Sequence, residues 1–359
     1  MVINYNQATN GRTMHLVGPG KLFIKSKVLT FQRADTAPFR LNWPTLSKLH
    51  LYGDISLTGA AINALFRNRV ITVFGSSGGH QYRGHLMSLA TETTLLRRWQ
   101  HLAESDSVMK LKIAKNFVQS KISSELKTAR HYQRHGIPIA SDLITNHTIR
   151  LDRIVRVTSL GQLRGFEGAA TAEWFSLMRT ILRPPFEFRS RIRRPPPDPV
   201  NSMLSLTSTW LLQKAATAIL NRGLELNVGF LHEYRPGRPS LACDLMEPLR
   251  CEFSEQWTMG LLNQSKLNLA DFQLIGHRCT MTGKTFPRVL FWWEKEWRER
   301  EGQRRLDTSL DELEQTLRLF GNSPNAPQGG GNEGPLGNPI ESQEVQRAPE
   351  ESTFRIKYC

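Results

Sequence analysis

The chain has 359 residues, 39% of them hydrophobic and 22% charged, which is typical of a globular protein long enough for two domains with separate cores. No run of 18 or more apolar residues occurs, and the first twelve residues lack the apolar core of a secretory signal, so we expect no membrane span and a cytoplasmic location. The formal net charge of +15 predicts a polyanionic partner, first of all nucleic acid, with a merely basic surface as the alternative.

Residues 1–90 are predicted to form a small β-rich domain. Strand patterns are indicated by apolar alternation and by Gly-containing turns, and Thr58 is placed to cap a short helix. The Gly-rich loop at 75–79, which follows the predicted strand at 70–74, lacks the Lys-Ser/Thr ending of a phosphate-binding loop, so we interpret it as a turn. The predicted elements are strands at 21–31, 49–53 and 70–74, a helix at 59–68 and a loop at 75–79.

Residues 91–320 are predicted to form a larger, all-α domain, which gives the chain an α+β fold class. Apolar residues recur there at spacings of three and four. The predicted helices are 87–104, 106–135, 165–182, 201–223, 253–263, 267–274 and one or two within 290–320, with a helix or connector at 149–159. Trp292, Trp293 and Trp297 are more typical of a core than of a base-stacking surface, although they lie among basic residues.

Residues 321–359 contain six Gly and five Pro with few large apolar residues, and are predicted to be disordered. They carry three basic and five acidic side chains, so the positive charge resides in residues 1–320. The four cysteines form no CxxC pair, which argues against a zinc ribbon and for reduced thiols.

The stretch from Leu231 to Arg250 concentrates side chains that could hold a metal. His232 precedes a turn broken by Pro236 to Pro239, and Ser240 is placed to cap the helix that follows. This helix carries Asp244 and Glu247, which are three residues apart and so share a face. A histidine and two carboxylates brought together by a rigid turn can bind a divalent cation.

An upstream carboxylate is needed to complete such a site, and Glu167 in the run GFEGAATAEWF is the candidate. Alone, Glu167 near the first turn of a helix could simply complement the helix dipole. Between Glu167 and His232 the chain has an Arg-rich, Pro-rich loop whose guanidinium groups suit phosphate, although such a run is often only solvated surface. The basic residues predicted to bind DNA are Arg189, Arg191, Arg193, Arg194 and Arg238.

Three segments, EGAATAEWF, RSRIRRPPPDPVNSMLS and GFLHEYRPGRPSLACDLMEPLR, together resemble the CRISPR-associated integrase family, the first-numbered proteins of the spacer-adaptation machinery. The segment GDISLTGAAINALFRNRVITVFGSSGG is similar to the N-terminal half of that family, so the resemblance covers about residues 15–320. The family has a β-rich N-terminal domain and an α-helical catalytic domain. By motif position, the resemblance implies that Glu167, His232 and Glu247 are metal ligands and that Asp244 is a further acidic residue of the site.

The resemblance also implies an activity: a metal-dependent DNA endonuclease and integrase that inserts foreign DNA as new spacers by 3′-hydroxyl transesterification. Expected partners are double-stranded DNA (protospacer and CRISPR repeat), a second copy of the chain, and the second-numbered adaptation protein. Magnesium or manganese suits two carboxylates and an imidazole. Ser208 departs from the family, where many members have Tyr, and the tail lies outside the family pattern. A related transposon integrase and a non-catalytic DNA-binding module remain as alternatives.

Overall fold

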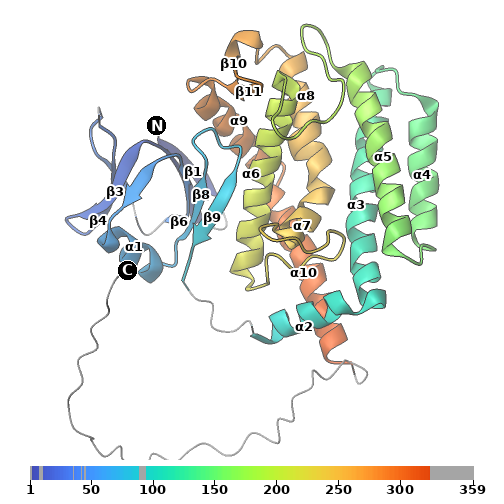
Figure 1. The fold of residues 1–359 in the computed structure, drawn as a ribbon, viewed down its shortest axis with the longest axis horizontal. Helices are drawn as coiled ribbons and strands as arrows, with labels where there is room; N and C mark the ends of the chain where they lie inside the picture. Colours follow the sequence, from blue (N-terminus) through green and yellow to red (C-terminus); the bar gives the residue numbers. More distant parts are fainter. Residues whose placement is uncertain are drawn as a thin grey trace, which may run out of the picture. The chain divides into compact units, whose positions relative to one another are not determined.

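The computed structural model describes residues 2–7, 11–34, 36–41, 43, 46–88 and 94–323. Strands dominate the chain as far as residue 88, and helices dominate it from residue 94 (Figure 1). The predicted α+β class with an N-terminal β-rich part is therefore confirmed. The predicted boundary at residue 90 and most of the predicted disordered tail, from residue 324 onward, lie outside the described residues.

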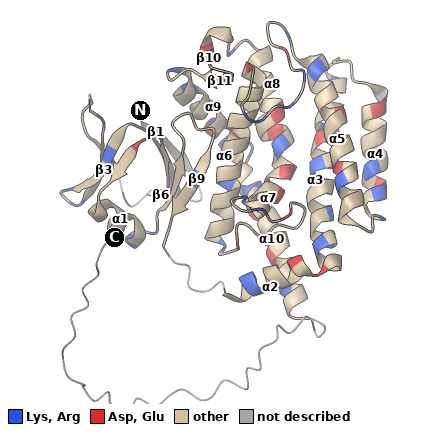
Figure 2. Ribbon diagram, viewed as in Figure 1, with Lys and Arg blue, Asp and Glu red and all other residues tan. Residues whose placement is uncertain are grey.

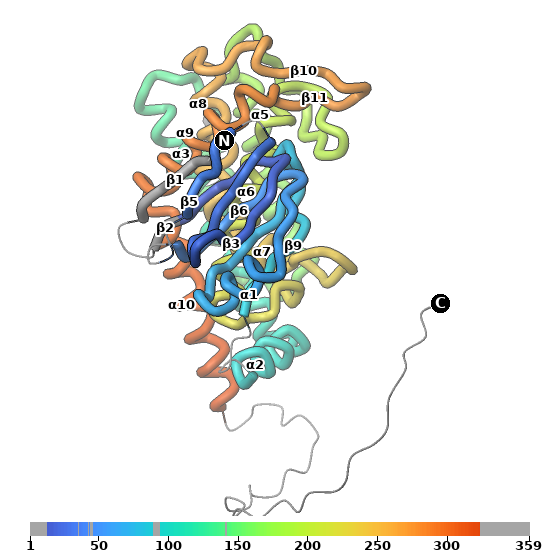
Figure 3. The backbone as a smooth tube through the Cα atoms, turned by 90° about the vertical axis from the view of Figure 1, so that its left-hand side faces the viewer, coloured from blue at the N-terminus to red at the C-terminus, as the bar shows by residue number. Residues whose placement is uncertain are grey.

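Two sheets are found in the described residues before position 88. The first has the strand order β1-β2-β6-β8-β9, with β2, β6 and β8 parallel and the outer two strands antiparallel to their neighbours. The second has the order β5-β4-β3-β7. Figure 3 looks onto these strands. The strands are β1 (Val2–Gln7), β2 (Gly11–Val17), β3 (Gly20–Lys25), β4 (Val28–Gln32), β5 (Phe39–Leu41), β6 (Leu46–Tyr52), β7 (Ile55–Leu57), β8 (Ile71–Gly75) and β9 (Tyr82–Leu86).

The helices agree with the expected pattern in most places. They are α1 (Gly59–Arg67), α2 (Thr94–Ser105), α3 (Ser107–Arg134), α4 (Ser141–Ile154), α5 (Leu160–Ile181), α6 (Pro199–Asn221), α7 (Ser240–Arg250), the π-helix η2 (Cys251–Gln256), α8 (Trp257–Asn263), the 3₁₀ turn η3 (Leu269–Asp271), α9 (Thr285–Glu299) and α10 (Gly302–Gly321). None of the helices in the described part of the chain is long and apolar enough to cross a membrane.

Local sequence explains where several of these elements begin. Thr58 accepts a hydrogen bond from the Ala61 N–H at 3.3 Å, which confirms it as the cap of α1. Asp198 accepts from the Asn201 N–H at 2.8 Å, and Pro199 occupies the first turn of α6, where its missing N–H costs nothing. The α6 helix is buried on nearly all sides, as expected for a helix that is apolar all round.

Buried polar contacts join the first sheet to the helices. Tyr52 on β6 donates to Gln213 Oε1 of α6 at 3.3 Å. The Nε2 of His15 on β2 lies 3.1 Å from Glu294 of α9, and Glu294 also accepts from Lys214 of α6 at 2.8 Å. These side chains are almost wholly buried. The sheet therefore contacts the helix that also lines the functional cavity described below.

Four expectations about the elements are wrong in detail. The run 21–31 forms two strands, because Ser26 and Lys27 adopt positive φ values of 49° and 63° and make a tight turn. The segment 267–274, predicted as a helix, instead contains η3 and the first strand of a hairpin. The hairpin pairs β10 (Phe272–Ile275) with β11 (Arg278–Met281), so the second part of the chain is helical but not all-α.

The α5 helix begins at Leu160, which places Glu167 two turns inside it and removes the helix-dipole explanation.

Charge is dispersed over the helices. Figure 2 shows Lys and Arg on α2, α3 and α4, with acidic residues interspersed among the helices.

The described cysteines Cys243, Cys251 and Cys279 are free thiols, as predicted. Trp293 and Trp297 are buried, which confirms the interpretation of both as core residues.

Candidate metal and nucleic-acid site

His232 lies in the connection between α6 and α7, where Gly237 with φ of 71° makes the bend. Its Nδ1 is 2.6 Å from Asp244 Oδ1. A carboxylate can only accept, so Nδ1 carries the proton and Nε2 keeps its lone pair. The lone pair is the feature that metal coordination or proton transfer requires.

Asp244 is fully buried and anchors the loop that carries His232. Its carboxylate accepts from the backbone N–H groups of Phe230 at 2.6 Å, Leu231 at 3.0 Å and His232 at 2.9 Å. With the imidazole contact, both oxygens are engaged by this one loop. The structure thus places Asp244 behind His232, as the group that orients the ring.

Two further side chains hold the same loop. Gln100 of α2 is buried, donates to the carbonyls of Glu225 and Val228 at 2.9 and 2.8 Å, and accepts from the Glu225 N–H. Arg164 of α5 donates to the Leu231 carbonyl at 2.9 Å and pairs with Glu233. Arg164 and Glu167 are on the same helix. The α5 helix therefore carries Glu167 and also holds the loop that carries His232.

Glu247 on α7 is buried among cations. Arg250 donates to its Oε1 at 2.8 Å, and Lys121 Nζ lies 3.1 Å from its Oε2. Burial alone raises the pKa of Glu247, but the charges of Arg250 and Lys121 outweigh burial and lower it to about 2. Arg250 also pairs with the buried Glu255 at 3.2 Å. Glu247 is therefore ionised throughout the physiological range.

Glu167 on α5 contacts this cluster through Lys121 of α3. Its Oε1 accepts from the Lys121 ammonium group and from the Thr171 hydroxyl at 3.0 Å. The same ammonium group contacts Glu247, so the two carboxylates share one cation. The sequence paired Glu167 with Glu247, and the structure places them on either side of Lys121.

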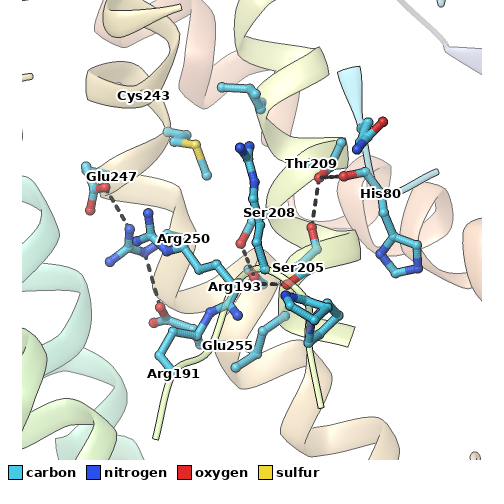
Figure 4. Close-up of a pocket in the computed structure, with 18 of the residues that line it drawn as sticks. His80, Arg191, Arg193, Ser205, Ser208, Thr209, Cys243, Glu247, Arg250 and Glu255 are labelled. Atoms are coloured by element: carbon cyan, nitrogen blue, oxygen red, sulfur yellow. Dashed lines mark hydrogen bonds and ion pairs between the residues drawn. The ribbon is translucent and has the colours of Figure 1, made fainter. Parts of the chain in front are cut away.

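A cavity of about 430 Å³ opens beside this cluster, and His232 and Glu247 both line it. In Figure 4, Glu247 and Cys243 lie on one side, His80 lies on the other, and Arg193, Ser205 and Ser208 lie between them. Apolar walls are supplied by residues such as Phe175, Leu204, Leu212 and Met246. A volume in this range suits a ligand of nucleotide size, with polar groups that fix its orientation.

Four of the five predicted DNA-binding arginines line this cavity: Arg191, Arg193, Arg194 and Arg238. Arg191 is held by Asn201 and Ser205, whereas Arg193 and Arg194 form no salt bridge to a carboxylate within the described residues. Burial and the neighbouring charge of Arg250 lower the pKa of Arg193, which marks a crowded positive region open to an anion. Arg189 lies outside the cavity lining and is highly exposed beside Glu187.

The donor types in the cluster fit a hard divalent cation: two carboxylates and one imidazole nitrogen. Within the described ranges, no three His, Cys, Asp or Glu side chains are gathered closely enough to hold a metal. The Lys121 ammonium group stands between Glu167 and Glu247 instead. The residues therefore fit the ion in kind, and the ammonium group contacts both carboxylates.

Several residues of the site were missed from the sequence. Lys121 carried no signal because it is one of many basic residues of α3, and Arg250 was not assigned a role although it ends the stretch from Leu231 to Arg250. His80 and Arg278 also line the cavity, and burial followed by the charge of Arg278 lowers the pKa of His80 to about 4, so its ring is neutral. Both come from turns and hairpins far from the motif, which only the fold brings together.

The structure corrects the prediction for Ser240 and shows where Ser208 lies. Ser240 does not cap α7: Pro239 holds that position, and the Ser240 hydroxyl donates to the Glu233 carbonyl at 3.0 Å. Ser208 lines the cavity and lies 3.2 Å from the Ser254 hydroxyl. A small hydroxyl there leaves space that a larger ring would fill.

Comparison with known proteins identifies a family whose model matches this chain. A family model described as CRISPR associated protein Cas1 matches residues 14–295. A "CRISPR-associated endonuclease Cas1 2" from Rhodospirillum rubrum is 37% identical over 231 residues, which cover 61% of this chain and 65% of that protein. A "CRISPR-associated endonuclease Cas1 3" from Thermus thermophilus is 31% identical over 255 residues, which cover 71% of this chain and 74% of that protein. The chain thus spans somewhat less than two thirds of the first of these relatives.

Solved structures share the fold at low sequence identity. A Cas1 protein from Thermotoga maritima aligns with a TM-score of 0.74 and 19% identity, covering 85% of this chain and 97% of that one. A Cas6-RT-Cas1–Cas2 complex aligns equally well, covering 88% of this chain and 36% of its own. A casposase bound to integration product aligns with a TM-score of 0.68 and 20% identity, covering 79% and 81% of the two chains.

Proposed function

Because this chain belongs to the family of CRISPR-associated protein Cas1, we propose that it is a metal-dependent DNA endonuclease and integrase that inserts foreign DNA fragments as new spacers into a CRISPR array. The observation that carries the proposal is that His232 and Glu247 line one cavity together with several arginines. Such a cavity combines ligands for a hard cation with groups that bind phosphate, which are the two requirements of phosphodiester chemistry.

Glu167, His232 and Glu247 are the residues that would hold the cation. A bound magnesium or manganese ion would polarise a phosphodiester and stabilise the charge of the leaving oxygen. His232 contributes Nε2, because Asp244 engages Nδ1. Asp244 acts as a positioning residue. Its three backbone contacts hold the loop, and its contact with Nδ1 orients the imidazole.

The reaction itself needs no covalent bond to the protein. A DNA 3′-hydroxyl forms a new P–O bond, the existing P–O bond to the neighbouring 3′ oxygen breaks, and the attacking hydroxyl loses a proton while the leaving oxygen gains one. The chain supplies orientation and charge. Arg193, Arg194 and Arg238 line the cavity near Glu247 and would bind the phosphates on either side of the reacting one.

The partners we propose are double-stranded DNA, as protospacer and CRISPR repeat, a second copy of this chain, and the second-numbered adaptation protein. Support for the last comes from the fold shared with a Cas6-RT-Cas1–Cas2 complex. Support for DNA comes from the casposase bound to integration product and from the charge of +15. The dimer rests on the family resemblance alone.

The decisive experiment is an integration assay with labelled DNA carrying free 3′-hydroxyl ends, a CRISPR repeat target, and added manganese or magnesium. His232→Ala and Glu247→Gln are expected to abolish joined product. His101→Ala, which changes an exposed histidine on α2, is the matched control and should retain it. Equal product from wild type and His232→Ala would overturn the proposal.

The same assay separates the alternatives. A transposon integrase would join its ends into targets without a CRISPR repeat. A non-catalytic DNA-binding module would bind both DNAs in a mobility-shift experiment and give no joined product with either.

A further inference from the structure

Lys121 is a buried lysine in the middle of α3 that the proposed reaction does not use. Lys121 is only 1% exposed. Because a lysine is almost never fully buried without partners, its contacts need an explanation. Its ammonium group donates to Glu167 Oε1 and to Thr171 Oγ1 at 2.8 Å, and lies 3.1 Å from Glu247 Oε2. An ammonium group has three donor positions, and these contacts involve both proposed carboxylate ligands.

The arrangement solves an electrostatic problem. Two carboxylates brought close together repel each other, which favours one of them turning away unless a cation lies between them. A cation shared by both removes the repulsion and fixes both side chains. In the described residues, Lys121 is the cation in contact with both carboxylates, because Arg250 contacts Glu247 and Glu255.

We propose that Lys121 is an internal counter-cation that occupies the space between Glu167 and Glu247 when no divalent cation is bound, and that binding of the cation displaces it. The inference rests on the proposed function, since it takes these two carboxylates as ligands. Lys121 is thus a positioning residue: it keeps the site assembled without metal and competes with the metal for it.

The chain also provides a place for the displaced group. Glu125 is one turn further along α3 and is buried. Residues four apart on a helix are neighbours, so a rotation of the flexible lysine side chain brings its ammonium group from the Glu167 side towards Glu125. His147 Nε2 lies 3.2 Å from the same Glu125 carboxylate.

The test measures manganese binding to the full-length protein without DNA, by electron paramagnetic resonance and by titration calorimetry. Lys121→Met removes the competing charge at similar length and should tighten manganese binding about tenfold, the low end of what one adjacent charge does to an ionisation equilibrium. Without metal, the same variant should have a lower melting temperature than wild type, and manganese should raise that temperature more than it does for wild type.

Three further variants make the result interpretable. Lys121→Gln is neutral but retains a hydrogen-bond donor, and should tighten binding even if Lys121→Met fails to fold. Lys121→Arg keeps the charge and should bind manganese no more tightly than wild type. Lys112→Met changes an exposed lysine of the same helix and should leave affinity and melting temperature unchanged.

The possible failures are distinct. If wild type binds manganese and Glu167→Gln abolishes binding, but the neutral Lys121 variants bind equally or more weakly, the counter-cation inference is overturned and the metal site stands. If wild-type binding is absent or is unaffected by Glu167→Gln and Glu247→Gln, the proposed metal site itself is wrong, and the inference falls with it.

Discussion

At the scale of single residues, Asp244 shows both the reach and the limit of sequence reasoning. Its spacing from Glu247 placed both on one side of a helix, and in the structure Asp244 contacts His232 while Glu247 lines the cavity beside it. Residues three apart nevertheless differ by about 60° around the helix axis. This difference turns Asp244 towards the His232 loop and Glu247 towards Arg250 and Lys121. Spacing could identify the group but could not assign the two roles.

Asp244→Asn should weaken the protein as well as its chemistry. The amide nitrogen would face a backbone N–H or the imidazole, where only an acceptor is tolerated. We expect a loss of about 1–3 kcal/mol in the free energy of unfolding, the usual cost of an unsatisfied buried group, and loss of integration. Urea denaturation measures the first effect, and an unchanged midpoint would contradict the role assigned to Asp244.

Gly229 is required for the close approach of the same loop to α7. A Cβ there would lie 2.8 Å from the Ser240 carbonyl carbon and 2.9 Å from Asp244 Oδ2. Gly229→Ala should therefore destabilise the protein by about 1–3 kcal/mol, as overpacking does. Gly165→Ala on α5, where a Cβ meets nothing within 4 Å, is the control and should be neutral or stabilising. Thermal denaturation of the pair checks the difference.

At the scale of elements, the sequence was most informative where a helix is long and amphipathic, and least where two short strands meet at a tight turn. The β10–β11 hairpin turns at Gly276 and His277, with Gly276 at φ of 60°. A two-residue loop beginning with Gly is a hairpin signal, but the strands are only four residues long, and their apolar residues also fit a helical spacing. Lys121 was missed for a related reason, since one buried lysine in a basic helix has no local signature.

The contact between the first sheet and α10 should be visible in the pH dependence of stability. Lys48 on β6 donates to Gln303 of α10 at 3.1 Å, and burial followed by the charge of Lys214 lowers its pKa to about 8. The unfolded chain retains a value near 10.4. Between these values the unfolded state binds the proton more tightly than the folded state, so stability rises with pH from about 8 to about 10.4.

Lys48→Met should remove that rise. Differential unfolding curves of wild type and variant across this window provide the measurement, and the gain in wild type should be at most about 3 kcal/mol. Lys25→Met, at an exposed position of β3, is the control and should preserve the wild-type slope. A variant curve parallel to wild type would show that Lys48 does not titrate in this window.

At the scale of the whole molecule, composition predicted the class of partner and the family resemblance predicted the fold, while neither predicted the cavity. Its walls combine a turn of the first sheet, the loops before and after α6, four helical segments (α5, α6, α7 and η2) and a hairpin. Arg193 and Arg278 are 85 residues apart in sequence and line the same space. Only tertiary structure can bring such residues together, so a pattern search along the chain has no access to them.

DNA affinity should reflect this cavity through its salt dependence. Removing one arginine that binds a phosphate reduces the slope of log affinity against log salt by about 0.9 for duplex DNA. Arg193→Ala with Arg194→Ala should therefore reduce the slope by about 2 in fluorescence-anisotropy titrations. Arg189→Ala tests whether phosphate binding extends past the cavity: a reduction of the slope by about one would show that Arg189 binds a phosphate, and no change would show that it does not. An unchanged slope in the double variant would show that Arg193 and Arg194 bind no phosphate.

The buried contacts between the first sheet and α6 also have a mechanical consequence. Gln213 and Lys214 are held by Tyr52 and by the Glu294–His15 pair, while Thr209 and Ser205, one and two turns earlier on the same helix, line the cavity. One part of the α6 helix is therefore fixed to the first sheet, and an earlier part of the same helix lines the cavity. A displacement of the strands is therefore expected to shift the cavity wall, because no loop separates the two groups of contacts on α6.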